Sequence, residues 1–87
     1  MYITKKNGKV VLYDTEKIIN SILKANGDTD EEELSRATAS YIANETFDRL
    51  TKEKDIITTQ DIRECVYDIL CKKGLPKTAE LYVNFQK

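Results

Sequence analysis

Histidine and tryptophan are absent from the 87 residues of this chain, and cysteine occurs only twice. Zinc sites use histidine or groups of cysteines, and Ser/His and Cys/His nucleophiles need a histidine as the base. Neither kind of centre can be assembled from this sequence. Cys65 and Cys71 lie six residues apart in a predicted helix and on different faces of it, so we expect reduced thiols.

Long apolar runs and an excess of charge of one sign are also lacking. No run approaches the about 18–20 apolar residues of a membrane helix, and the start does not resemble a signal peptide, so we expect a cytoplasmic protein. Lysine and arginine number 14, aspartate and glutamate 15, and the net charge is −1. Binders of nucleic acid or membranes normally carry a basic excess, so the balance argues against both partners. What remains is a single small domain, residues 1–87, that binds or regulates.

The charges are unevenly distributed along the chain. Residues 1–13 carry Lys5, Lys6 and Lys9 without any acid, whereas residues 28–33 carry five acids without any base. We therefore expect an anionic ligand to meet the N-terminal segment.

The N-terminal segment has the pattern of a β-hairpin. Asn7-Gly8 lies between two short strand-prone runs, residues 2–6 and 9–13, and both turn residues tolerate the positive φ of a two-residue turn. Such a turn pairs Ile3 with Leu12. The more apolar face of the hairpin would then carry Ile3, Lys5, Val10 and Leu12.

Helical spacing of apolar residues follows the hairpin. The first predicted helix, residues 15–26, has Asp14 as its N-cap and ends at a left-handed Asn26-Gly27 stop. The second, residues 30–51, starts at a capping box formed by Thr29 and the acid three residues later.

Two further helices complete the prediction. The third begins at a cap formed by Thr58 or Thr59 and ends at Gly74, and Pro76 opens a short fourth. The predicted fold class is α+β, with an N-terminal β-hairpin packed on a four-helix bundle.

Several cations stand where local rules disfavour them. Lys17 and Arg63 lie in the first turns of predicted helices, at the positive end of the macrodipole, and Lys6 would face Lys9 across the hairpin. A bound polyphosphate would relieve this repulsion. Thr59 lies four residues before Arg63, so a hydroxyl and a guanidinium share one helix face.

An ordinary explanation stands beside this one. Each cation taken alone fits a solvated or ion-paired surface role, and Thr59 fits a plain N-cap. No Gly-x-x-x-x-Gly-Lys loop is present, and the acids of residues 28–33 do not converge on a Mg²⁺ site. A nucleotide would therefore be bound and not turned over.

Four segments together resemble the ATP cone family. Residues 3–9, Ile-Thr-Lys-Lys-Asn-Gly-Lys, and residues 13–18, with Tyr-Asp-x-x-Lys-Ile, resemble the family's N-terminus. Residues 57–64, Ile-Thr-Thr-Gln-Asp-Ile-Arg-Glu, resemble the start of its third helix. Residues 74–85 are similar to its ending, where Ala-x-x-Tyr is followed by another aromatic residue.

The resemblance implies a regulatory domain, without catalysis of its own, that binds ATP or dATP, with Mg²⁺ as an accompanying cation. Such cones occur at the N-terminus of ribonucleotide reductases, the anaerobic class being the most similar, and in a bacterial transcriptional repressor of these enzymes. The nucleotide would control the activity or oligomerisation of an attached or partner reductase. The implied nucleotide contacts are Ile3, Lys5, Lys6, Lys17, Ile18, Thr59, Asp61, Arg63 and Lys87.

Two departures from the family pattern leave the choice between ATP and dATP open. Lys6 stands where the family often has arginine, and Arg63 replaces the histidine of some members, so both positions keep or add charge. We read the chain as an excised cone or a stand-alone one. The alternatives are a protein-interaction module with weak or vestigial nucleotide binding, and the cone of a transcriptional repressor.

Overall fold

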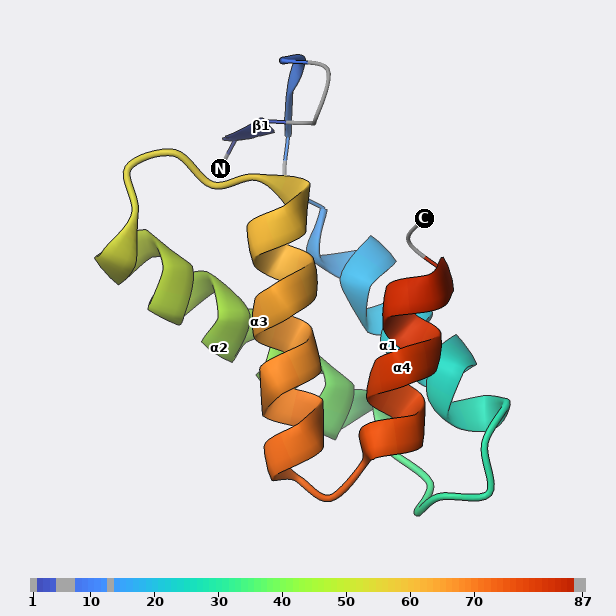
Figure 1. Cartoon of the computed structure of the whole chain (residues 1–87). Coiled ribbons are helices and arrows are strands. Elements are labelled where there is room, and N and C mark those ends of the chain that lie inside the picture. The colour runs from blue at the N-terminus through green and yellow to red at the C-terminus, as the bar shows by residue number, and fades with distance from the viewer. Residues whose placement is uncertain (1, 5–7, 13, 86–87) are drawn as a thin grey trace.

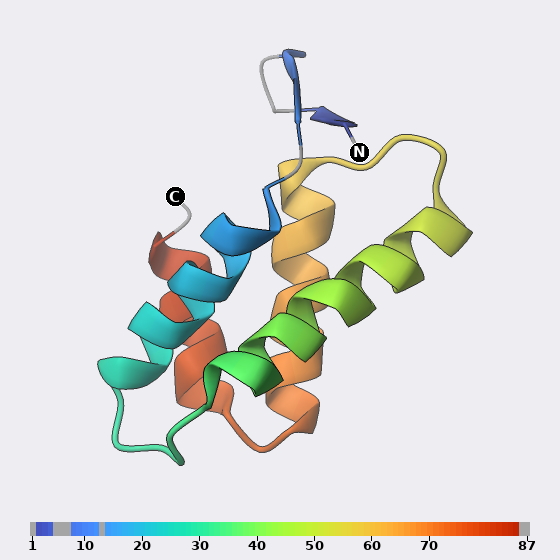
Figure 2. The same ribbon diagram turned by 180° about the vertical axis from the view of Figure 1, so that it is seen from behind.

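The computed structural model of the chain describes residues 2–4, 8–12 and 14–85. Its elements, in chain order, are β1 (Tyr2–Thr4), β2 (Val10–Leu12), α1 (Thr15–Gly27), α2 (Arg36–Glu53), α3 (Thr59–Lys72) and α4 (Pro76–Phe85) (Figure 1). Helices α1 and α3 each pack against both α2 and α4. The four helices therefore surround one core, as the view from behind also shows (Figure 2).

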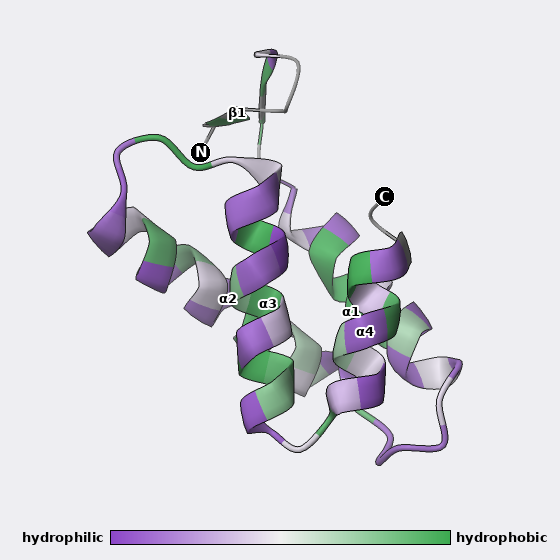
Figure 3. Cartoon of the chain, viewed as in Figure 1, coloured by the Kyte–Doolittle hydropathy of each residue, from purple (hydrophilic) through white to green (hydrophobic). Residues whose placement is uncertain are grey.

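The core is made by apolar residues that recur every three or four positions along each helix. Figure 3 shows the result on α3, where apolar and polar positions alternate in bands. The largest fully buried side chains are Tyr82, Ile22, Ile42, Leu70, Val66, Thr46 and Thr78. Burial of each large apolar side chain contributes about 1.5–3 kcal/mol, so packing between helices is the main stabilising term.

The predicted α+β class, with a hairpin packed on the bundle, is wrong. The fold is α-helical, because helices build the core and, among the described residues, no sheet layer covers any of them. The two strands that the structure describes have three residues each, pair with one another, and project from one end of the bundle (Figures 1 and 2). Ile3 is the one described strand side chain that enters the core.

The register of the strand pair also differs from the prediction. The antiparallel partners are Tyr2 and Leu12, Ile3 and Val11, and Thr4 and Val10. A slip of one residue moves side chains to the opposite face. Ile3 is accordingly buried, whereas Val10 and Leu12, predicted to share its face, are 61% and 66% exposed. Gly8 has φ +82°, as predicted for a turn residue, while Asn7 and Lys5 lie outside the described residues.

Helix α1 begins as predicted, since the Asp14 side chain caps it. Its end is different from the prediction. Gly27 is the last helical residue, and among the described residues only Gly8 and Gly74 have a positive φ, so the left-handed Asn26-Gly27 stop is wrong. Asn26 is instead a buried residue whose side chain organises the following loop.

Helix α2 begins later than the predicted residue 30, and the capping box at Thr29 is wrong. The Asn26 side chain donates to the Glu32 carbonyl at 2.9 Å and accepts from the Leu34 N–H at 2.8 Å, which holds these residues in a loop. Ser35 then provides the N-cap. A side chain from the preceding helix has therefore prevailed over the local capping signal.

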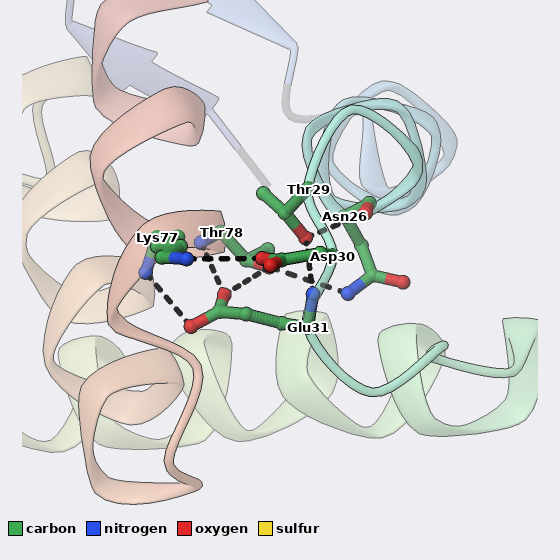
Figure 4. Close-up of polar contacts among 6 residues, drawn as sticks. All are labelled: Asn26, Thr29, Asp30, Glu31, Lys77 and Thr78. Carbon is green, nitrogen blue, oxygen red and sulfur yellow. Dashed lines mark hydrogen bonds and ion pairs between the residues drawn. The ribbon is translucent and has the colours of Figure 1, made fainter.

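The same loop is fixed to the start of α4 (Figure 4). Glu31 accepts hydrogen bonds from the backbone N–H groups of Lys77, at 3.0 Å, and Thr78, at 2.7 Å. The ammonium of Lys77 lies 3.0 Å from Asp30. Glu31 thus satisfies N–H groups that the helix itself cannot satisfy, and both acids lie at the positive end of its dipole.

The predicted boundary between α3 and α4 is confirmed. Gly74 has φ +80°, and the Leu75 N–H donates to the Leu70 carbonyl at 3.0 Å, as in a Schellman motif. Pro76 is the first residue of α4, where its missing N–H costs nothing.

Candidate functional site

Four parts of the chain meet at one end of the bundle, which we call the strand end. They are the strand pair, the first turns of α1 and α3, and the last turn of α4 (Figures 1 and 2). Helix N-termini present unsatisfied N–H groups and a partial positive charge. Two of them at one end make the strand end the favourable place for an anion.

The first turns of α1 border a hollow of about 330 Å³. Among the described residues it is lined by Lys17, Ile18, Asn20 and Ser21. Lys17 is exposed and Ile18 is buried, so a charged group and an apolar wall lie side by side. This combination suits a ligand with an anionic part and an apolar part.

The first turns of α3 present Thr59 and Arg63 on one face. Thr58, and not Thr59, is the N-cap, so the Thr59 hydroxyl is not the capping group. Arg63 donates to the Gln60 side chain at 2.7 Å. Burial raises the pKa of Tyr82, on α4, to about 12, and the nearby Arg63 charge opposes this rise. The Arg63 charge therefore lies near Tyr82 on α4.

Asp61 is oriented differently. It completes a capping box with Thr58, accepting the Thr58 N–H at 2.9 Å, and forms an ion pair of 2.7 Å with Lys54. Burial raises the pKa of Asp61, but the Lys54 ammonium and the Thr58 donors outweigh burial and bring it below its usual value. Two residues along a helix correspond to about 200°, so Asp61 points away from the face of Thr59 and Arg63.

The nine predicted contacts fall into three groups. Those that lie on β1 or in the first turns of α1 and α3, at the strand end, are Ile3, Lys17, Ile18, Thr59 and Arg63. Those outside the described residues are Lys5, Lys6 and Lys87. Asp61 forms the third group: it lies in the first turn of α3, but its side chain is directed toward Lys54 at the end of α2.

Three polar residues near the site were missed by sequence reasoning. Asn20 and Ser21 line the hollow, and their spacing of three and four residues from Lys17 was the available signal. Lys54 was not among the predicted contacts, and nothing local indicates that it pairs with an acid seven residues later.

Neither a metal centre nor a membrane helix is found in the part of the chain that the structure describes. Among residues 2–4, 8–12 and 14–85, no group of three His, Cys, Asp or Glu side chains could hold a metal ion. Within the same ranges, no helix has the length and apolar character needed to cross a membrane. The cytoplasmic location stays a prediction.

The fold and the strand end define a class of protein: a small helical domain with a hollowed end suited to an anionic ligand. The chain belongs to the ATP cone family, since the family model described as the ATP cone domain matches residues 1–87. ATP cones bind ATP or dATP as allosteric effectors, so this is a nucleotide-binding regulatory domain and not a catalytic one. No curated protein matched the chain in the comparison.

Proposed function

We propose that the strand end binds ATP or dATP, and that the bound nucleotide controls the activity or oligomerisation of a ribonucleotide reductase, as part of that enzyme or as its partner. The family match over residues 1–87 carries this proposal. The hollow beside Lys17 supports it, because its volume of about 330 Å³ falls within the about 300–1,000 Å³ of ligand pockets.

The proposed contacts divide by chemistry. Lys5 and Lys6 would hold the phosphates, with Mg²⁺ as counter-ion, and Ile3 would line the base. The wall of the site would be completed by Lys17 and Ile18.

The remaining contacts come from other parts of the chain. Thr59 and Arg63 would contact the nucleotide from α3, and Lys87 from the C-terminus. The hydroxyl and the guanidinium share one face of α3, which favours their joint use on one ligand.

Control of a reductase requires that ATP and dATP favour different states. Each nucleotide shifts an equilibrium only by its difference in affinity for the two states, typically about 1–3 kcal/mol. A small difference in contacts at the strand end is therefore enough for regulation.

Calorimetric titration with ATP and dATP, with and without Mg²⁺, tests the binding. Lys5→Ala and Lys6→Ala should each weaken binding about tenfold or more, because each removes a charge-assisted contact to phosphate. The control is Lys52→Ala, an exposed lysine in the last turn of α2 that is not among the proposed contacts. Absence of heat with millimolar nucleotide and the native chain would sink the proposal.

A protein-interaction module is the second candidate, favoured by three exposed apolar side chains. Val10, Leu12 and Ile56 are 61–68% exposed. Size-exclusion chromatography with and without dATP separates the two functions. A change of particle size that occurs only with dATP supports the allosteric proposal. Association that is the same with and without dATP supports the interaction module.

A further inference from the structure

Asp61 places a full negative charge in the first turn of α3, where an anionic ligand is proposed to bind. Both of its oxygens are engaged: one accepts the Thr58 N–H at 2.9 Å and the other lies 2.7 Å from the Lys54 ammonium. Its side chain is only 13% exposed. Water therefore does little to screen this carboxylate, and Lys54 is the cation that neutralises it.

We infer that Lys54 is a positioning residue of the nucleotide site: it neutralises Asp61 and keeps that carboxylate from repelling the anionic nucleotide at the strand end. The inference rests on the proposed nucleotide function. Lys54 acts through Asp61 and has no contact of its own with the nucleotide.

The backbone of Lys54 fixes the origin of its side chain. Lys54 is the C-cap of α2, and its N–H donates to the Leu50 carbonyl at 2.9 Å. Lys54 and Asp61 also line a common groove of about 280 Å³ between α2 and α3. The ammonium thus reaches Asp61 from the α2 side, opposite to the face of Thr59 and Arg63.

The backbone of Asp61 lies within one ionic screening length of the first residue of α3. Asp61 is two residues from Thr59, a rise of about 3 Å along the helix axis. The Debye length is about 8 Å at physiological salt. An unneutralised carboxylate at this position would oppose both the helix dipole and the cations that attract phosphate.

A merely structural role makes a different prediction. If Asp61 and Lys54 served only to stabilise the start of α3, removing either one would weaken nucleotide binding. If the charge matters, Lys54→Met weakens binding, whereas Asp61→Asn strengthens it, because the asparagine removes the repulsion.

The test is calorimetric titration with ATP at low ionic strength of the native chain, Lys54→Met, Asp61→Asn and the double variant. We expect Lys54→Met to lose about two- to fivefold in affinity, and Lys54→Arg to restore it, as for a charge at a helix terminus. Asp61→Asn should gain about twofold, and Lys54→Met should cost nothing further in that background. The loss should shrink at high salt.

Lys52→Met is the matched control, because Lys52 is an exposed lysine in the last turn of α2. An unchanged affinity of Lys54→Met, or a weakened one of Asp61→Asn, overturns the inference. Should Lys54→Met not fold, as judged by circular dichroism, the direction of the Asp61→Asn effect decides alone. Absence of ATP binding by the native chain is a separate result, which refutes the proposed function itself.

Discussion

Asn26 and Thr78, which are 52 residues apart in the chain, share a hydrogen bond in the core (Figure 4). The Asn26 amide donates to the Thr78 hydroxyl at 3.2 Å, and the hydroxyl donates to Glu31 at 2.9 Å. Asn26 is 4% exposed and Thr78 is fully buried. One buried hydroxyl therefore joins α1, α4 and the acidic loop between α1 and α2, which contains Glu31. This junction lies at the end of the bundle opposite to the strand end.

Thr78→Val should lower the free energy of unfolding by about 1–2 kcal/mol, because it leaves buried polar partners without a hydrogen bond while keeping the side-chain volume. Denaturation in urea measures the loss. Thr51→Val is the control, since the exposed Thr51 hydroxyl bonds only to carbonyls of its own helix. A loss for Thr78→Val no larger than that of the control would show that the network does not stabilise the fold.

Acid should loosen the same end of the molecule. Burial raises the pKa of Glu31, but the N–H groups of Lys77 and Thr78 outweigh burial and bring it below its usual value of 4.5. The unfolded chain therefore takes up the proton first, so the stabilisation is complete above pH 4.5 and is lost as the pH falls toward the folded pKa.

Unfolding free energies measured between pH 7 and pH 3 test this. Glu31→Gln should show a weaker fall in stability below pH 4.5 than the native chain. Glu33→Gln, at an exposed position of the same loop, should keep the native pH dependence. Parallel curves for the native chain and Glu31→Gln would be the contrary result.

The glycines at the C-terminal ends of α1 and α3 should respond oppositely to alanine. Gly74 has φ +80°, so Gly74→Ala should cost about 1–2 kcal/mol through backbone strain alone. Gly27 is helical, so Gly27→Ala should stabilise by about 0.5–1 kcal/mol. An added methyl group meets no atom within 4 Å at either position, so packing does not confuse the comparison.

Thermal unfolding of the two variants provides the measurement. A destabilising Gly27→Ala would mean that this residue needs the left-handed conformation after all. A neutral Gly74→Ala would contradict the Schellman ending of α3.

Local signals predicted those parts of the fold whose causes are local. Thr58, Gly74 and Pro76 act through their own backbone and neighbours, and all three boundaries are confirmed. The predicted capping box at Thr29 was wrong because Asn26, which is hydrogen-bonded to Thr78, holds as a loop the residues that the predicted α2 would have included. No window of sequence around Thr29 contains that information.

The prediction of the strand register was wrong for a related reason. Both faces of the strand pair carry apolar residues. The alternation pattern therefore fits two registers equally well: one places Val10 and Leu12 on the face of Ile3, and the other places Val11 there. The burial of Ile3 against the end of the bundle, which the strand sequences do not contain, accompanies the second register.

The candidate site was predictable to the extent that its residues follow helical spacing. Thr59 and Arg63 share one face of α3, Lys17 and Ile18 lie in the first turns of α1, and the structure brings these two helix starts to one end, while their contact with a nucleotide stays a prediction. The pairing of Asp61 with Lys54 depends on how α2 meets α3, which no local spacing reveals.

A bulky side chain in the hollow should block nucleotide binding without harming the fold. Ser21 is half-buried and lines the hollow with Lys17, so Ser21→Phe fills the space while keeping a helical residue on α1. We expect calorimetry to show at least a tenfold loss of ATP affinity, because the phenylalanine ring excludes the ligand. A tenfold loss corresponds to about 1.4 kcal/mol of binding free energy. Asn44→Phe, on the exposed face of α2, is the control for added aromatic surface. Native affinity in Ser21→Phe would place the nucleotide outside this hollow.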